Sequence, residues 1–148
     1  MPTTNLPPTL QSVSVFLCEK VLQEKDEVLT FIRSVEIFNV AIIPDIPIDR
    51  QGPTMIAVVI GKLQPNDLSE HSVQLQLIRP GGETKLIGDE HRDVFVANLP
   101  DYPGGFTFAQ QMAISPKEMG LHYMAVLFDG KEVARTPFML RPAATSAA

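Results

Sequence analysis

The sequence predicts an all-β protein, folded as an antiparallel β-sandwich of about eight to ten strands. Thirteen prolines and nine glycines interrupt the 148 residues at short intervals, and runs rich in β-branched and aromatic side chains lie between them. Two apolar runs flank Asp129-Gly130, a dipeptide typical of two-residue hairpin turns. Segment 72–79 alternates apolar and polar residues, which is the pattern of a strand with one buried face.

The other strands follow in order along the chain. Segment 11–18 alternates, with Val13, Val15 and Leu17 on one face. Segment 28–43 is a long extended run, and segment 54–63 is almost continuously apolar. Pro80-Gly81 suits the central positions of a type II turn after segment 72–79. The remaining expected strands are 83–87, 93–97, 106–114, 121–128 and 131–140.

Segment 17–32 has two interpretations. Its apolar residues fit the stripe of an amphipathic helix, and they also fit two strands joined by a turn at residues 24–27. The strand interpretation is favoured because Thr30, Phe31 and Ile32 prefer a pleated surface. Further along, Pro137 cannot donate a ladder hydrogen bond, so we expect it at a sheet edge or a bulge.

Length and composition indicate one globular domain. Apolar residues make up 45% and charged residues 20% of the chain, a balance that is wrong for a disordered protein. We assign residues 11–141 to the sandwich domain, 1–10 to an N-terminal segment and 142–148 to a mobile C-terminal tail of small residues.

The charge and the cysteine content constrain partners and compartment. The net charge of −5 repels phosphate backbones, so neither nucleic acid nor an anionic membrane is expected as a partner. Cys18 is the only cysteine, which rules out an internal disulfide, and its apolar neighbours indicate a buried thiol. The N-terminus lacks the pattern of a signal peptide, and no apolar run is long enough to span a bilayer. A cytoplasmic location is expected.

Segment 121–128 is apolar on both faces. Tyr123 is expected to point into the core together with Leu121, Ala125 and Leu127, which leaves an outer face of Met124, Val126 and Phe128. A sandwich strand needs only one apolar face. Two explanations stay open: loops or the N-terminal segment cover the outer face, or it is an interface with a second subunit.

The hairpin at residues 120–140 resembles the last hairpin of immunoglobulin-like and filamin-like sandwich domains. Tyr123 stands where such domains often carry a tyrosine corner, and Asp129-Gly130 forms the turn. The chain has no tryptophan and no cysteine pair, so the resemblance is to the architecture and not to antibody domains. It implies an immunoglobulin-like antiparallel β-sandwich.

Residues 10–141 also resemble a bacterial family known only as a domain of unknown function. The resemblance implies a β-sandwich and transfers no catalytic residue, and the glycine usual in the family after Asp26 is Glu27 here. The matching residues are Leu17-Cys18-Glu19, Val21, Asp26 to Thr30, Ile32-Arg33, Val73-Gln74-Leu75, Arg79-Pro80-Gly81-Gly82, Gly120-Leu121-His122-Tyr123 and Asp129-Gly130.

The densest polar cluster is segment 88–93. On a strand, Asp89, His91 and Asp93 share one face and could supply carboxylate and imidazole ligands to a metal ion. The alternative is a solvated turn with mixed charge. The chain contains neither a nucleophile elbow nor a phosphate-binding loop motif.

We therefore expect a non-enzymatic interaction or assembly module that associates with itself or with another protein and needs no cofactor. The alternative is a small-ligand or metal-binding protein, or an enzyme, that uses Asp89, His91 and Asp93.

Overall fold

The computed structural model describes residues 6–23, 29–65, 69–94 and 104–143. It confirms the all-β prediction, since the described residues form nine strands and one short 3-10 helix, η1 (Ile48–Arg50). The strands are β1 (Leu10–Gln23), β2 (Leu29–Ser34), β3 (Ile37–Val40), β4 (Thr54–Leu63), β5 (Glu70–Ile78), β6 (Thr84–Val94), β7 (Gly105–Ala113), β8 (Gly120–Phe128) and β9 (Lys131–Pro142).

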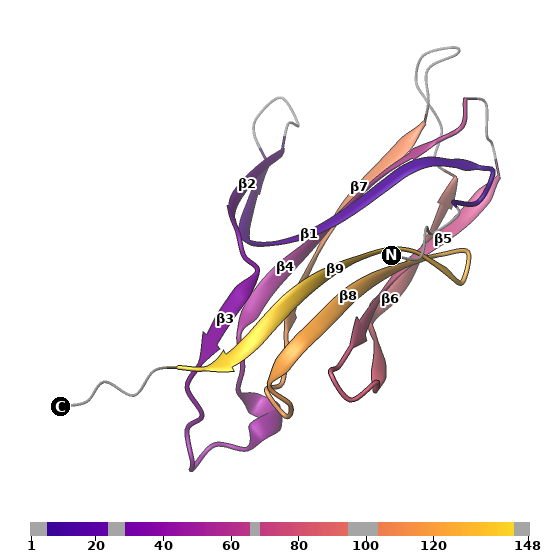
Figure 1. Cartoon of the computed structure of the whole chain (residues 1–148). Coiled ribbons are helices and arrows are strands. Elements are labelled where there is room, and N and C mark those ends of the chain that lie inside the picture. The colour runs from indigo at the N-terminus through magenta and orange to yellow at the C-terminus, as the bar shows by residue number, and fades with distance from the viewer. Residues whose placement is uncertain (1–5, 24–28, 66–68, 95–103, 144–148) are drawn as a thin grey trace.

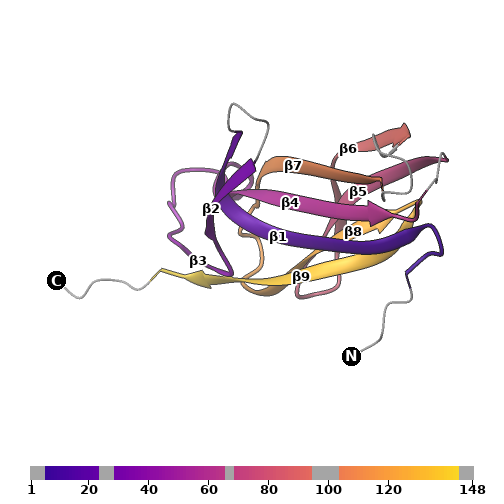
Figure 2. The same cartoon turned by 90° about the horizontal axis from the view of Figure 1, so that it is seen from above.

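The strands form two sheets (Figures 1 and 2). The first has the order β2-β1-β4-β7 and the second the order β3-β9-β8-β5-β6. Neighbouring strands run antiparallel except β3 and β9, which are parallel. Among the described residues, no helix has the length and apolar character that crossing a bilayer requires.

Strands β1 and β2 settle the ambiguity of segment 17–32. Cys18 to Gln23 pair antiparallel with Ser34 to Leu29, so the strand interpretation is right; the turn at 24–27 lies outside the described residues. The first half of β1 pairs with β4, and Cys18 is the residue at which the pairing passes from β4 to β2. Burial raises the pKa of the Cys18 thiol, which keeps it protonated and unreactive.

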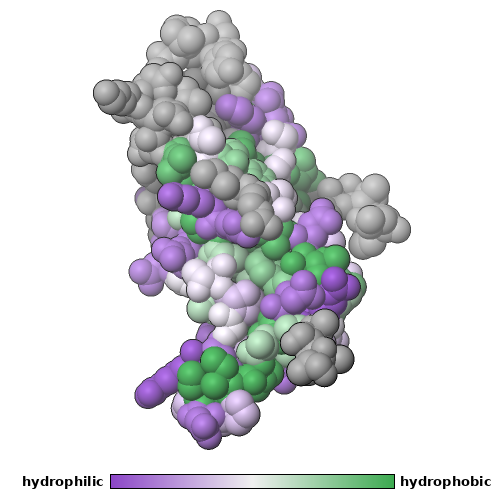
Figure 3. Space-filling view, turned by 90° about the vertical axis from the view of Figure 1, so that its left-hand side faces the viewer, coloured by the Kyte–Doolittle hydropathy of each residue, from purple (hydrophilic) through white to green (hydrophobic). Residues whose placement is uncertain are grey.

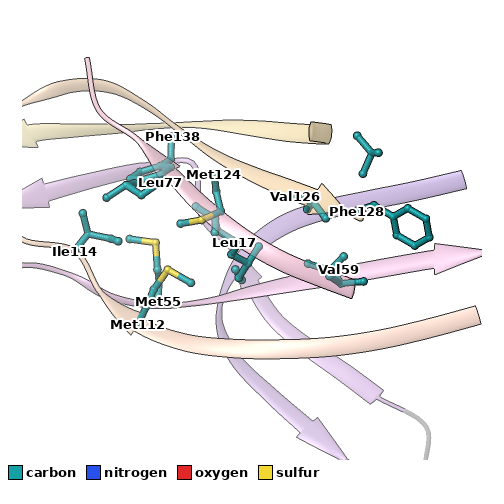
Figure 4. Packing of buried hydrophobic residues seen from close by; sticks show 14 of the residues in the cluster. Leu17, Met55, Val59, Leu77, Met112, Ile114, Met124, Val126, Phe128 and Phe138 are labelled. Carbon is teal, nitrogen blue, oxygen red and sulfur yellow. The ribbon is translucent and has the colours of Figure 1, made fainter. Parts of the chain in front are cut away.

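The two sheets enclose one apolar core. Side chains from β4 and β7, including Met55, Met112 and Val59, face side chains from β5, β8 and β9 (Figure 4). Removing apolar surface of this extent from water is the main force that holds the sheets together.

Met124, Val126 and Phe128 belong to this core, and the expectation that they form an outer interface face is wrong. Each is completely buried, and Figure 4 shows them among the other core residues. Alternation alone does not determine which face of this strand points inward, because both faces are apolar. His122 lies inside, with its ring stacked on Phe138 at 5.2 Å between centroids.

Tyr123 lies on the opposite face, so its assignment to the core also needs correction. Its side chain is half-buried, and the guanidinium carbon of Arg135 lies 5.0 Å from the centroid of its ring. Such a cation–π contact stabilises a partly exposed ring by about 0.5–1 kcal/mol.

The hairpin turn contributes more than its backbone shape. Asp129 and Gly130 have φ values of 50° and 81°, the positive values that a type I′ turn requires at both central positions. The Asp129 carboxylate accepts hydrogen bonds from the Ser72 backbone N–H at 2.9 Å and from the His71 Nδ1 at 2.8 Å. The turn is thereby fastened to β5. Pro137 lies where β9 pairs with β8 alone, because the described pairing with β3 begins at Met139.

We predict that Phe128→Ala lowers the free energy of unfolding by about 3–5 kcal/mol, because it leaves a cavity in a fully buried site. Tyr123→Ala should cost only about 1–2 kcal/mol, because the ring is half-exposed and loses mainly the Arg135 contact. Denaturant unfolding of the two variants measures both values. Equal losses would show that Tyr123 belongs to the core after all.

Candidate functional site

The sequence-predicted metal ligands lie on β6. Asp89 and His91 are exposed, and the ring of His91 lies 4.7 Å from that of Phe108. Residues 88–90 form a bulge, because His91 pairs with Val73 while Ile87 pairs with Leu75. Segment 88–93 is therefore part of one continuous strand and not an inter-strand turn.

This arrangement does not assemble a metal site from the side chains that the structure describes. No group of three or more His, Cys, Asp or Glu side chains in the described part of the chain could hold a metal ion. The side chain of Asp93 lies outside the described residues, so its participation stays a prediction.

A different region combines exposed apolar and cationic side chains. It lies at the β5–β6 end of the molecule, which is the end that carries the turn between these strands, the segment 114–119 and η1 (Figure 1). Sequence reasoning assigned no site there.

The loop that follows β3 presents apolar side chains to solvent. We call residues 41–47 the isoleucine loop; its Ile42, Ile43 and Ile46 are 45%, 50% and 39% exposed. Eight large apolar side chains are exposed in the described part of the chain, and four of them are isoleucines at positions 37 to 46. Figure 3 shows apolar residues gathered at the lower end of this side of the molecule.

One side chain holds the isoleucine loop in place. The Gln51 amide nitrogen donates to the backbone carbonyls of Ile43 and Ile46 at 2.9 and 2.6 Å, and its oxygen accepts from the Ile43 N–H at 2.6 Å. These bonds satisfy backbone groups of Ile43 and Ile46 that would otherwise need a neighbouring strand as partner. The isoleucines are consequently displayed on an ordered segment.

A pocket of about 390 Å³ opens beside this loop. We call it the basic pocket, because four of the described residues that line it are cationic, namely Arg50, Arg79, Lys85 and Lys117, and two are acidic, namely Asp49 and Glu83. Its other lining residues are Gln51, Leu77, Ile87, Ala113, Ile114 and Ser115.

Arg79 is a buried cation that directly follows the last residue of β5. It continues the inward positions of β5, and only 6% of its surface is exposed. Its Nη1 donates to the Ser115 carbonyl oxygen at 3.0 Å, while its buried Nε has no hydrogen-bond partner. A buried charged group with an unused donor is costly, and such groups usually have an anionic partner.

The wall of the basic pocket is built by close backbone packing. The Ser115 hydroxyl donates to the Ile48 carbonyl oxygen at 3.1 Å, and the Ile114 N–H donates to the Pro53 carbonyl at 3.1 Å. Gly52 has a φ of 126°, and a Cβ at this position would collide with the Ile114 carbonyl oxygen. Segment 48–53 can therefore lie against segment 114–115 only with glycine at position 52.

Two of the charged residues that line the basic pocket already form an ion pair with each other. The Lys117 Nζ lies 3.2 Å from Asp49 Oδ1, an exposed ion pair of small energetic weight. These two charges cancel. The surplus of positive charge in the pocket therefore comes from Arg50, Arg79 and Lys85, of which Glu83 offsets one.

His122 lies close enough to Arg79 for the two charges to interact, and it stands next to Tyr123, which pairs with Ile78. Its Nδ1 contacts the Gly120 carbonyl oxygen at 2.9 Å, so the proton belongs on Nδ1 and the buried, unpartnered Nε2 is an acceptor. Burial lowers the pKa of His122, which favours the neutral ring.

The sequence contains one signal that points to this region. Alternation in segment 72–79 places residue 79 on the inner face with Val73, Leu75 and Leu77, and an arginine at an inward position is unusual. The isoleucine loop and the partners of Arg79 have no comparable signal, because they depend on contacts between distant segments.

No protein-family model and no curated protein matches this sequence. Solved structures with a similar fold include two of a β-glucosidase from Listeria innocua, one of them with isofagomine. Both are 10% identical to the chain, cover 90% of it and have TM-scores of 0.50 and 0.51. The Pseudomonas fluorescens alkylpurine DNA glycosylase AlkC bound to DNA is 11% identical over 86% of the chain, with a TM-score of 0.46.

The chain spans only 16–30% of the length of these structures. At such identities the likeness concerns the fold alone.

We predict that Gly52→Ala destabilises the protein more than Gly82→Ala. Both glycines have positive φ, which costs an alanine about 1–2 kcal/mol. Only Gly52 also faces a backbone atom, which should add at least about 2 kcal/mol. Thermal or denaturant unfolding compares the variants, and equal losses would contradict the close packing of segments 48–53 and 114–115.

The lowered pKa of His122 predicts a pH-dependent stability. The unfolded chain takes up a proton near the ordinary value of 6.5, whereas the folded state resists protonation. Stability contributed by the neutral ring is therefore present above that value and is lost as the pH falls through it. Unfolding measured between about pH 7.5 and 5.5 should show a shallower pH dependence for His122→Gln than for the wild type. Identical slopes would contradict this.

Proposed function

We propose that this protein is a non-enzymatic interaction module with an immunoglobulin-like fold, and that it associates with a second copy of itself. The observation that carries the proposal is the open edge formed by the uncharged strand β3 and by the exposed isoleucines of the loop that follows it, in which Asp45 is the one charged residue.

The order of the strands supports the immunoglobulin-like assignment. In such domains strands A, B and E lie in one sheet and strands G, F and C in the other, to which variable-type domains add C′. Here β1, β4 and β7 are adjacent in one sheet, and β9, β8, β5 and β6 follow one another in the second. Strand β2, which pairs with the second half of β1, is an addition to that plan.

Strand β3 supports self-association because it is an open edge. It pairs with β9 on one side and is the last strand of its sheet among the described strands. Its residues are Ile37, Phe38, Asn39 and Val40, which carry no charge. Edge strands usually avoid unwanted pairing by means of charged residues, prolines or bulges.

The isoleucine loop extends the same apolar surface. Ile37 is 48% exposed, and the ordered loop adds three more exposed isoleucines directly after β3. An edge that meets its own copy about a twofold axis would bury both sets at once and complete the backbone hydrogen bonds of β3.

We predict that the wild type is a dimer at about 10–100 µM, a range in which a weak but specific interface is populated. Ile37→Lys should convert it to a monomer, because it introduces a charge on the open edge strand of the proposed interface. The double variant Ile43→Ser/Ile46→Ser should weaken association by at least about tenfold through loss of apolar contact. Gel filtration coupled to light scattering measures the mass of each.

Leu86→Ser is the matched control, because Leu86 is 52% exposed but lies on β6, at the opposite edge of the sheet. It should leave the mass unchanged. A monomeric wild type over the whole concentration range, or a dimer that only Leu86→Ser disrupts, would refute the proposal.

A further inference from the structure

We propose that the basic pocket is a binding site for a phosphate group, either as free phosphate or as a phosphomonoester. Residues 37–47 of the proposed dimer edge do not line this pocket, so the proposal does not require self-association.

The charge of the pocket is opposite to that of the chain. The protein carries 12 Lys and Arg residues and a net charge of −5, yet four of these 12 cations line this one pocket. With Asp49 and Glu83 counted, the pocket holds a surplus of two positive charges. In an acidic protein this concentration of cations in a concave site raises the local concentration of anions.

Arg79 shows that the site is incomplete without an anion. It is almost fully buried, its Nε has no partner, and among the described residues it makes no ion pair with a carboxylate. A buried guanidinium that has no directly bonded carboxylate recovers only part of the cost of leaving water. An oxyanion in the pocket would offset this cost while keeping the Ser115 hydrogen bond.

The pocket is organised before any ligand binds. Ser115 joins β5 to η1, since its carbonyl oxygen accepts from Arg79 and its hydroxyl donates to Ile48. Arg50 lies in η1, Lys85 in β6 and Arg79 in the turn between β5 and β6, so cations from three segments converge on the pocket. Binding therefore costs little ordering of the site.

The surplus of two charges selects the ligand class. A phosphate group carries between one and two negative charges near neutral pH and presents several acceptor oxygens to surrounding donors. A guanidinium with flanking ammonium groups is the donor set that recognises it. A pocket of about 390 Å³ also leaves room for a small organic group attached to the phosphate.

Isothermal calorimetry with inorganic phosphate and with glycerol 3-phosphate tests the proposal. Ionic strength is held constant with sodium chloride, so that general screening cancels. We expect saturable binding with a Kd of about 1 mM or tighter for at least one of the two. Tighter binding of the ester identifies a phosphomonoester as the ligand, and tighter binding of phosphate identifies the free ion.

Variants locate the site. Lys85→Gln and Arg50→Gln change exposed side chains and should each weaken binding by about tenfold, as loss of a charge-assisted contact does. Lys131→Gln is the matched control, because Lys131 is an exposed lysine beside the β8–β9 turn, at the far end of β8 from the pocket. Arg79→Gln should abolish binding, and its folding is checked by thermal unfolding.

Three results would overturn the proposal. The first is no saturable heat with either probe up to about 20 mM. The second is binding that Lys85→Gln and Arg50→Gln leave unchanged, which would place the anion elsewhere. The third is equal affinity for succinate, which would show that the pocket selects charge and not phosphate. Light scattering on the same samples reports self-association separately, so the two proposals fail independently.

Discussion

The hydrogen bond from Arg79 Nη1 to the Ser115 carbonyl oxygen is the contact on which the β5–β6 end of the molecule depends. A guanidinium this deeply buried needs fixed acceptors, and Ser115 supplies one while its hydroxyl holds Ile48. Segment 114–115 thereby joins the end of β5 to η1, and Gly52 allows the two segments to approach. The basic pocket and the ordered loop beside it both follow from this junction.

Sequence alternation predicted the strands better than it predicted which way they face. The all-β class, the hairpin at Asp129-Gly130 and the paired strands around residues 17–32 could be recognised, because each has a local signal in turn residues or β-propensity. The orientation of β8 could not, because a strand with two apolar faces carries no information on its phase. The structure shows that His122 and Phe128 point into the core and that Tyr123 points away from it, the opposite of the expected orientation.

The candidate site was less predictable than the fold, for a different reason. Arg50, Arg79 and Lys85 come from three segments that meet only in the folded chain, so their spacing in the sequence has no pattern. Segment 88–93 had the opposite property. Its charged residues are adjacent in sequence, but a bulge interrupts the alternation of β6 there, and the described side chains form no group that could hold a metal ion.

The two surfaces at this end are physically linked through segment 49–51. Arg50 lines the basic pocket, and the neighbouring Gln51 holds the isoleucine loop with its side-chain amide. An anion that engages Arg50 would restrict the backbone of η1 and with it the position of Gln51. By reciprocity, any stabilisation of the loop in a dimer would strengthen anion binding to the same degree. Because an exposed loop is inexpensive to disorder, even a weak ligand at the pocket could shift how firmly the isoleucines are displayed.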